Sequence, residues 1–357
     1  MTKFNRRNLL VTGLLAGITE ITITRFAQAQ TTKDAPQASD DIEAIFGADR
    51  DPSSNSLTTS PQPSASLTLP IVSYDRAISK LLIRCSHLGM EQFERGQRDS
   101  RFNGAIGALN SYDKAFDSYT QTASFTATLD ATTTLLPNLG NIGDRIVRRV
   151  ISPRRVFIGF ALTSATHNII VFRGTSNPKE WIANFQARQS VYRQSGLIRG
   201  KVHTGFLRLY NQLSNQVRSA ANRFNPSLPC LITGHSLGGA LATLATADLA
   251  QANRPLQEQL QLYSYAAPRV GDSDFAKSFS ALCPNNFRVI NFADMVPMVP
   301  PSTLRNQQYS HTGQEWAFLD YAGGDVASSH TTTLYQSAID QNIEVNQIPV
   351  FPTACRS

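Results

Sequence analysis

The strongest constraint on this chain is a Gly-x-Ser-x-Gly pentapeptide at residues 234–238, set between two predicted regular elements. The apolar run at 230–233 predicts a buried strand, and the alanine-rich segment from 237 to about 252 predicts a helix. Such a sharp strand-to-helix turn strains the serine backbone, and glycines on both sides leave no Cβ where the two elements crowd together. We therefore expect a nucleophile elbow, with Ser236 held at the sheet edge beside a helix N-terminus.

Strands and helices alternate along the second half of the chain. An antiparallel pair of strands is predicted at 156–161 and 168–172, further strands at 262–266, 287–292 and 315–319, and helices at 275–282 and 332–339. This alternation favours an α/β fold, with a mostly parallel central sheet flanked by helices on both faces. An amphipathic helix is predicted at about 74–97, whereas residues 98–150 show no clear pattern.

The N-terminal residues differ in character from the rest of the chain. Residues 1–29 resemble a twin-arginine export signal, with Arg6 and Arg7 before an apolar region and an Ala-x-Ala cleavage site at 27–29. The alternative is a basic, disordered N-terminus. The uncharged run from 8 to 19 is shorter than the roughly 18 residues that a membrane-spanning helix needs, so no stable transmembrane segment is expected. Residues 30–68, rich in Ser, Thr, Pro and Gln, predict a disordered leader before a domain at 69–357.

The distribution of charge indicates which kinds of partner the chain could bind. The net charge of +7 is scattered rather than gathered into a basic stripe, so no nucleic-acid partner is expected, while weak attraction to an anionic lipid surface stays open.

The four cysteines are Cys85, Cys230, Cys283 and Cys355. In an exported protein they could form up to two disulfides, for example between Cys85 and Cys355, or Cys230 could be a small buried apolar residue. No spacing suits zinc, and no metal or cofactor is expected.

A serine hydroxyl becomes a good nucleophile only when a positioned base takes its proton. In α/β-hydrolase sheets the acid and the histidine follow the serine, in that order, at later strand ends. His330 comes after the last predicted strand and is the expected base, whereas His311 precedes that strand and is interpreted as structural. Asp294 directly follows the strand at 287–292 and is the expected acid. The less favoured acids are Asp272, Asp274 and Asp325.

The negative oxygen that forms when an ester carbonyl is attacked needs two hydrogen-bond donors. One expected donor is the backbone N–H of Leu237, directly after the serine. The second is expected from Thr175, which follows the strand at 168–172, with Gly174 allowing close approach. A Gly-Thr pair after a strand is, by itself, more often an ordinary turn.

Several segments, in this order along the chain, resemble the class 3 lipases, the group that includes the filamentous-fungal triacylglycerol lipases. They are residues 170–175 with Trp181, 202–206, 233–240, 267–272, 294–297 with Pro300 and Pro301, and His330 with Tyr335. The resemblance implies an α/β-hydrolase fold, lipase or esterase activity, a Ser236–Asp294–His330 triad and an oxyanion contribution from Thr175. Residues 98–150 match no part of the family pattern.

The same resemblance implies a lid after Thr175. In residues 176–189, Trp181, Ile182 and Phe185 are spaced to share one helical face, which would open at a lipid–water interface. The alternative is a surface helix packed permanently on the domain.

The function expected is that of an exported serine hydrolase that cleaves carboxylic esters of lipids through an acyl-enzyme. Phospholipase, galactolipase and feruloyl-type esterase activities are alternatives, and a catalytically silent lipid-binding protein is a more remote one. The sequence does not indicate the oligomeric state.

Overall fold

The computed structural model describes residues 69–129, 154–175, 188–193, 196–304, 306–320, 328–341 and 343. The chain divides into two compact units, Met1–Leu69 and Pro70–Ser357, and the elements below belong to the second. The predicted signal at 1–29 and the predicted leader at 30–68 lie outside the described residues.

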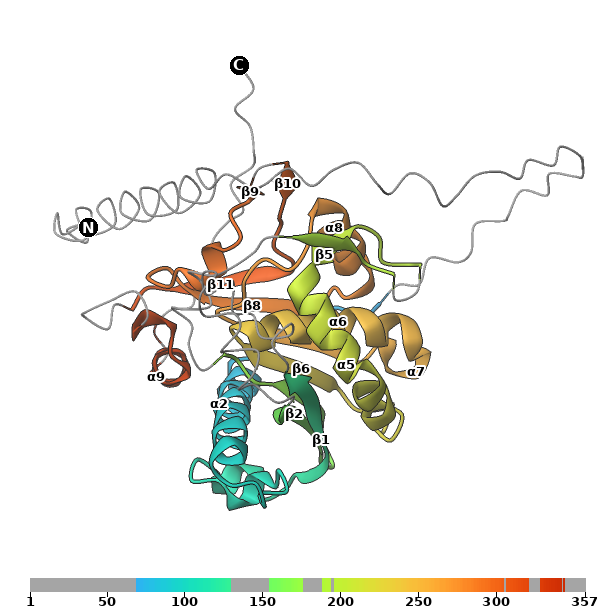
Figure 1. Cartoon of the computed structure of the whole chain (residues 1–357). Coiled ribbons are helices and arrows are strands. Elements are labelled where there is room, and N and C mark those ends of the chain that lie inside the picture. Colours follow the sequence, from blue (N-terminus) through green and yellow to red (C-terminus); the bar gives the residue numbers. More distant parts are fainter. Residues whose placement is uncertain are drawn as a thin grey trace, which may run out of the picture. The chain divides into compact units, whose positions relative to one another are not determined.

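The second unit is built on a central sheet that, within the described residues, has seven strands in the order β1-β2-β3-β6-β7-β8-β11 (Figure 1). Their bounds are β1 Thr120–Leu129, β2 Arg154–Thr163, β3 Asn168–Phe172, β6 Cys230–His235, β7 Leu260–Tyr265, β8 Asn286–Asn291 and β11 Gln314–Phe318. The run from β3 to β11 is parallel, while β1 and β2 are antiparallel to their neighbours. The carboxyl ends of the five parallel strands therefore share one edge of the sheet.

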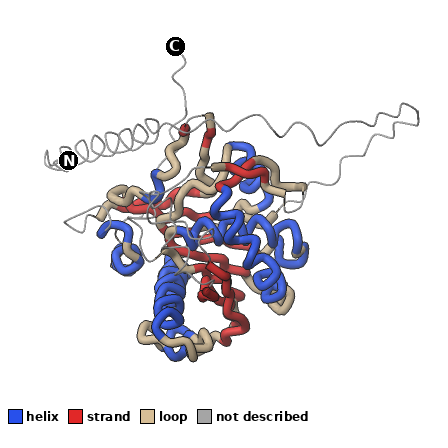
Figure 2. Tube along the Cα trace, in the orientation of Figure 1, coloured by secondary structure: helices blue, strands red, loops and turns tan. Residues whose placement is uncertain are grey.

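Helices cover both faces of this sheet (Figures 1 and 2). On one face lie α5 (Thr204–Ala221), α6 (Leu237–Ala252) and α8 (Ser273–Leu282), and on the other lie α2 (Arg76–Arg98) and α9 (Thr332–Asp340). Every residue of β3, β6, β7 and β8 is buried, as parallel strands between two helical layers require. Side chains alternate between the two cores: Ile170 and Phe172 pack on the α6 side, and Ile169 on the α2 side.

Most predicted elements are confirmed, with bounds that differ by one or two residues. The elbow helix has the predicted bounds, and α2 begins at Arg76, where the Asp75 carboxylate accepts hydrogen bonds from the N–H groups of the first turn. Two of the longer elements, β1 and α5, were not predicted. β1 is a sheet-edge strand of mostly polar residues, so it lacks a strong apolar pattern. The amphipathic α5 also escaped prediction, although its apolar face packs against α6.

Three cysteines are free, buried thiols: Cys85, Cys230 and Cys283. Cys85 has no disulfide partner among the described residues; Cys355, its suggested partner, lies outside them, so this pairing stays a prediction. Burial raises the pKa of Cys230 to about 12, so this thiol behaves as a small apolar side chain. In the described ranges, no helix is long and apolar enough to cross a membrane, and no group of three His, Cys, Asp or Glu could hold a metal.

Candidate active site

Ser236 lies between β6 and α6 with φ 58° and ψ −127°, a backbone conformation that costs energy for any residue other than glycine. Two hydrogen bonds hold the turn: the Ser236 N–H donates to the Tyr265 carbonyl at 2.9 Å, and the Ser236 carbonyl accepts from the Gly239 N–H at 2.9 Å. The residue is only 1% exposed, and its Oγ has no hydrogen-bond partner among the described residues. This is the strained strand-to-helix turn that the sequence predicts.

The two glycines of the pentapeptide are required by close backbone contacts. A Cβ on Gly234 would collide with the backbone of Gly238. A Cβ on Gly238 would in turn overlap the carbonyl of Phe172 and lie 2.8 Å from that of Arg173, at the end of β3. The start of α6 thus packs directly on the carboxyl end of the neighbouring strand, because neither glycine carries a side chain.

The loop that follows β3 passes against the elbow. A Cβ on Gly174 would lie 3.0 Å from the His235 carbonyl oxygen and 3.4 Å from Ser236 Cβ. The next residue, Thr175, is half-buried, and Leu237 is the first residue of α6. The N–H of Leu237 is therefore among the first-turn donors of α6, which have no partner within the helix. The two segments expected to supply oxyanion donors meet beside the serine.

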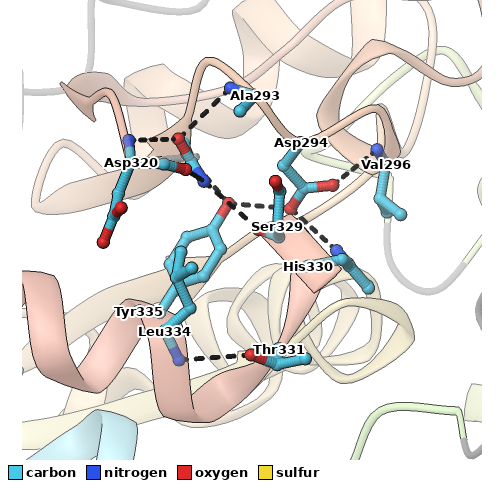
Figure 3. Close-up of polar contacts among 10 residues, drawn as sticks. Ala293, Asp294, Val296, Asp320, Ser329, His330, Thr331, Leu334 and Tyr335 are labelled. Carbon is cyan, nitrogen blue, oxygen red and sulfur yellow. Dashed lines mark hydrogen bonds and ion pairs between the residues drawn. The ribbon is translucent and has the colours of Figure 1, made fainter. Parts of the chain in front are cut away.

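His330 and Asp294 form a buried pair (Figure 3). His330 Nδ1 lies 2.7 Å from Asp294 Oδ2, and the two side chains are 2% and 0% exposed. Because a carboxylate only accepts, Nδ1 carries the hydrogen, and Nε2 is left as an acceptor in the neutral ring. Nε2 has no partner in the described part of the chain. The ring centroid of His330 lies 4.6 Å from that of His235, which places the pair next to the elbow.

Two further hydrogen bonds hold the Asp294 carboxylate in place (Figure 3). The Val296 N–H donates to Oδ1 at 2.9 Å, and the Tyr335 hydroxyl donates to Oδ2 at 2.8 Å. The same hydroxyl accepts a 2.9 Å hydrogen bond from the Asn291 N–H. Tyr335 therefore links the end of β8 to the carboxylate. Its position five residues after His330 was noted only as part of the family pattern.

Asn291 is a residue of the site that the sequence interpretation missed. Its Nδ2 donates to the carbonyls of Asp320 and Ser329 at 2.7 and 3.3 Å, and its Oδ1 accepts from the Ala293 and Asp320 N–H groups at 3.2 and 3.0 Å. One buried side chain thus joins the loop that carries Asp294 to the residue before His330. Its place inside the predicted buried strand at 287–292 was the available signal, since a polar side chain is unusual there.

The other histidine and the less favoured acids considered for the catalytic site are not part of the His330–Asp294 pair. His311 Nε2 donates to the Pro297 carbonyl at 2.8 Å, and desolvation together with the guanidinium groups of Arg288 and Arg269 lowers its pKa well below the usual range. Asp272 caps α8, where Oδ1 accepts from the Phe275 N–H at 2.9 Å. Asp325 lies outside the described residues.

The predicted lid carries three apolar side chains. Trp181, Ile182 and Phe185 all lie outside the described residues.

Known proteins resemble this chain in both sequence and fold. Residues 169–304, which contain most of β3, the elbow and Asp294, match the model of the family described as lipase (class 3). This segment belongs to the class 3 lipase family. The chain is 36% identical over 178 residues to a secreted mono- and diacylglycerol lipase of Fusarium solani, covering 48% of this chain and 50% of the relative. It is 38% identical over 156 residues to a lipase of Rhizomucor miehei, covering 42% and 41%.

The chain thus spans about half the length of the curated lipases it matches. A solved structure of a Rhizomucor miehei lipase–propeptide complex, a deletion mutant, superposes with a TM-score of 0.51 at 27% identity and covers 75% of this chain and 83% of that one. The central, mostly parallel sheet flanked by helices is therefore the α/β-hydrolase fold of the fungal lipases.

Proposed function

We propose that this class 3 lipase homologue is a serine hydrolase that cleaves carboxylic esters of lipids through a covalent acyl-enzyme. The observation that carries the proposal is the buried His330–Asp294 pair beside the strained Ser236 turn. A buried carboxylate bonded to one imidazole nitrogen, with the other nitrogen free to accept, is the arrangement that activates a serine hydroxyl.

The first half of the proposed reaction forms the acyl-enzyme. Ser236 Oγ attacks the ester carbonyl carbon while its proton moves to His330 Nε2. Asp294 holds Nδ1–H and stabilises the imidazolium that forms. When the tetrahedral intermediate collapses, the bond to the alkoxy oxygen breaks, and the Nε2 proton passes to the leaving alcohol. The enzyme then carries the acyl group on Ser236 and His330 is neutral again.

Water completes the cycle in the second half. His330 Nε2 takes a proton from the water, whose oxygen attacks the acyl carbon, and then returns that proton to Ser236 Oγ as the carboxylic acid leaves. In both halves the negative oxygen would accept from the N–H groups of Leu237 and Thr175. Removal of one such donor typically lowers kcat about 100- to 1,000-fold.

The lipid substrate is inferred from the names of the matched relatives, one of which is a mono- and diacylglycerol lipase. We propose acylglycerols presented at a lipid–water interface as the substrate class. Phospholipids, galactolipids and feruloyl esters share the same acyl chemistry, and a series of esters that varies the acyl chain and the alcohol separately would distinguish them.

We also propose that residues 1–29 direct export, which a change of Arg6 and Arg7 to lysine should block.

The hydrolase proposal is tested with Ser236→Ala. Wild-type protein should hydrolyse a short-chain p-nitrophenyl ester and be labelled at Ser236 by an alkyl phosphonate, whereas the variant should do neither. A folded Ser236→Ala protein with undiminished hydrolysis would refute the assignment. A wild-type protein that binds lipid vesicles but shows neither hydrolysis nor labelling would support the silent binding protein instead.

A further inference from the structure

Arg173 is an unusual buried charge directly before the loop proposed to hold the oxyanion. It is only 5% exposed, and no carboxylate pairs with it among the described residues. Burial lowers the pKa of its guanidinium to about 10, so the group is still a cation at neutral pH. Burial of a cation is costly when none of the described carboxylates pairs with it, which raises the question of what the side chain does.

Within the part of the chain that the structure describes, this guanidinium makes two contacts. Nη1 donates a short 2.6 Å hydrogen bond to the carbonyl oxygen of Gly174, the next residue. The guanidinium carbon lies 3.9 Å from the ring centroid of Phe93, on α2. The aromatic face supplies the electrostatic attraction that a carboxylate would otherwise provide, and it fixes the plane of the guanidinium.

The backbone of Arg173 is also held from both sides. Its N–H donates to the Ile158 carbonyl at 2.9 Å, which extends the pairing of β2 and β3. On the α2 side, a Cβ on Gly89 would lie 3.5 Å from Arg173 Cβ, and on the elbow side a Cβ on Gly238 would lie 2.8 Å from the Arg173 carbonyl oxygen. The backbone of Arg173 is therefore fixed, and its side chain donates to the Gly174 carbonyl from a fixed starting position.

The Gly174 carbonyl and the Thr175 N–H belong to the same peptide group. Because this group is planar and trans, its C=O and N–H point in opposite directions, and a hydrogen bond that fixes one also fixes the other. A charge-assisted hydrogen bond on the oxygen also polarises the amide, which makes its N–H a stronger donor.

From this arrangement we infer that Arg173, clamped on Phe93, is a positioning residue that orients and polarises the Thr175 N–H toward the oxyanion formed at Ser236. The inference rests on the proposed hydrolase function. It concerns a residue that does not touch the substrate and acts only through the 174–175 peptide group. Its contribution should therefore appear in the transition state and not in ester binding.

The test compares Arg173→Met, Arg173→Lys and Phe93→Leu with wild type. Methionine keeps much of the length of arginine without the charge, so the fold should survive. Kinetics with a soluble p-nitrophenyl ester would give kcat and KM, and inhibition by an alkyl boronic acid would report affinity for a tetrahedral anion. We expect Arg173→Met to lower kcat about 10- to 100-fold, to weaken boronate inhibition by a similar factor, and to change KM less than about threefold.

The other two variants should lower kcat less than Arg173→Met does, because each keeps part of the arrangement. Arg173→Lys keeps the cation but loses the planar fork, so it should recover part of the lost kcat. Phe93→Leu keeps the apolar volume but removes the ring face, and should lower kcat and boronate affinity together by a smaller factor than Arg173→Met.

Arg218→Met is the matched control for loss of a buried charge contact. Arg218 Nε donates to Asp248 at 2.9 Å, and Asp248 lies about 17 Å along α6 from Leu237 at the usual helical rise of about 1.5 Å per residue. This variant should lose stability while kcat and boronate affinity stay within about twofold of wild type.

The outcomes separate the two proposals. If wild type hydrolyses the ester and is labelled at Ser236, but Arg173→Met matches Arg218→Met in kcat and boronate affinity, the positioning role is wrong and the hydrolase proposal stands. If wild type shows neither hydrolysis nor labelling, the hydrolase proposal fails, and the positioning role fails with it.

Discussion

The hydroxyl of Tyr335 donates a 2.8 Å hydrogen bond to Asp294 Oδ2, the same oxygen that contacts His330 Nδ1 at 2.7 Å. The tyrosine comes from α9, the aspartate from the loop after β8, and the histidine from the turn before α9. Both hydrogen bonds converge on one oxygen of a fully buried side chain, so the carboxyl group is held in a fixed orientation.

Tyr335→Phe should weaken the support of Asp294 without removing the aromatic ring. The change leaves the Asn291 N–H without its acceptor and Asp294 without one donor, and we expect a loss of about 1–3 kcal/mol in the free energy of unfolding. kcat should fall about 3- to 30-fold, because the imidazole is less well oriented. Urea denaturation and steady-state kinetics measure the two effects. Tyr309→Phe is the control, since the Tyr309 hydroxyl donates a long 3.4 Å hydrogen bond to the Arg188 carbonyl and has Gln189 as a neighbour instead of the Asp294 carboxylate.

Gly174→Ala should impair catalysis more than folding. The new methyl group would lie 3.0 Å from the His235 carbonyl oxygen, so the loop must move away from Ser236 by a few tenths of an ångström. Because displacement of catalytic groups by even about 1 Å can cost about 100-fold in rate, we expect a decrease of about tenfold in kcat. Gly107→Ala, where nothing lies within 4 Å of the added Cβ, should leave the kinetics unchanged. Equal kcat values for the two variants would contradict the close approach of this loop.

Asn291→Ala should uncouple the two loops that carry the acid and the base. The change removes four hydrogen bonds to the backbone of residues 293, 320 and 329, and we expect a loss of about 2–4 kcal/mol in stability together with a fall of at least about tenfold in kcat. Asn285→Ala is the matched control. Asn285 also contacts two backbone groups, the Val72 N–H and the Pro70 carbonyl, so its loss should lower stability but leave kcat unchanged.

The buried histidines should make the fold sensitive to mild acid. The pKa values of His235 and His311 lie well below the usual range, chiefly because burial disfavours the charged ring. Below about pH 6.5 the unfolded chain therefore binds protons that the folded chain does not, and stability falls as the pH falls. The stabilisation is fully present above this pH. Each such histidine contributes a slope of up to about 1.4 kcal/mol per pH unit.

His311→Gln tests this sign, because glutamine keeps an N–H donor for the Pro297 carbonyl but does not titrate. The free energy of unfolding, measured by urea denaturation at pH values from 5 to 7.5, should depend less steeply on pH in the variant. A slope equal to that of wild type would show that His311 is not held neutral in the folded protein.

The sequence by itself determined the local features of this protein. Apolar runs and alanine-rich periodicity identified β6 and α6 around Ser236, and the glycines at 234 and 238 predicted a turn too tight for side chains. The order of strands also nominated Asp294 and His330. The predictions of strands and helices were confirmed because backbone sterics and the burial of parallel strands act over a few residues and leave a repeated pattern, whereas the catalytic roles of Asp294 and His330 stay predictions.

Only the tertiary structure decided which polar side chains meet. The sequence neighbours of Asn291 and Arg173 do not indicate the partners of these side chains. Asn291 joins β8 to the turn before His330, and Arg173 joins α2 to the loop beside Ser236. β1 was missed for a related reason: a mostly polar edge strand is stabilised by its pairing with β2 and not by its own pattern. Hydrogen bonds between segments far apart in the chain depend on the packing of the whole sheet, and local sequence carries little record of them.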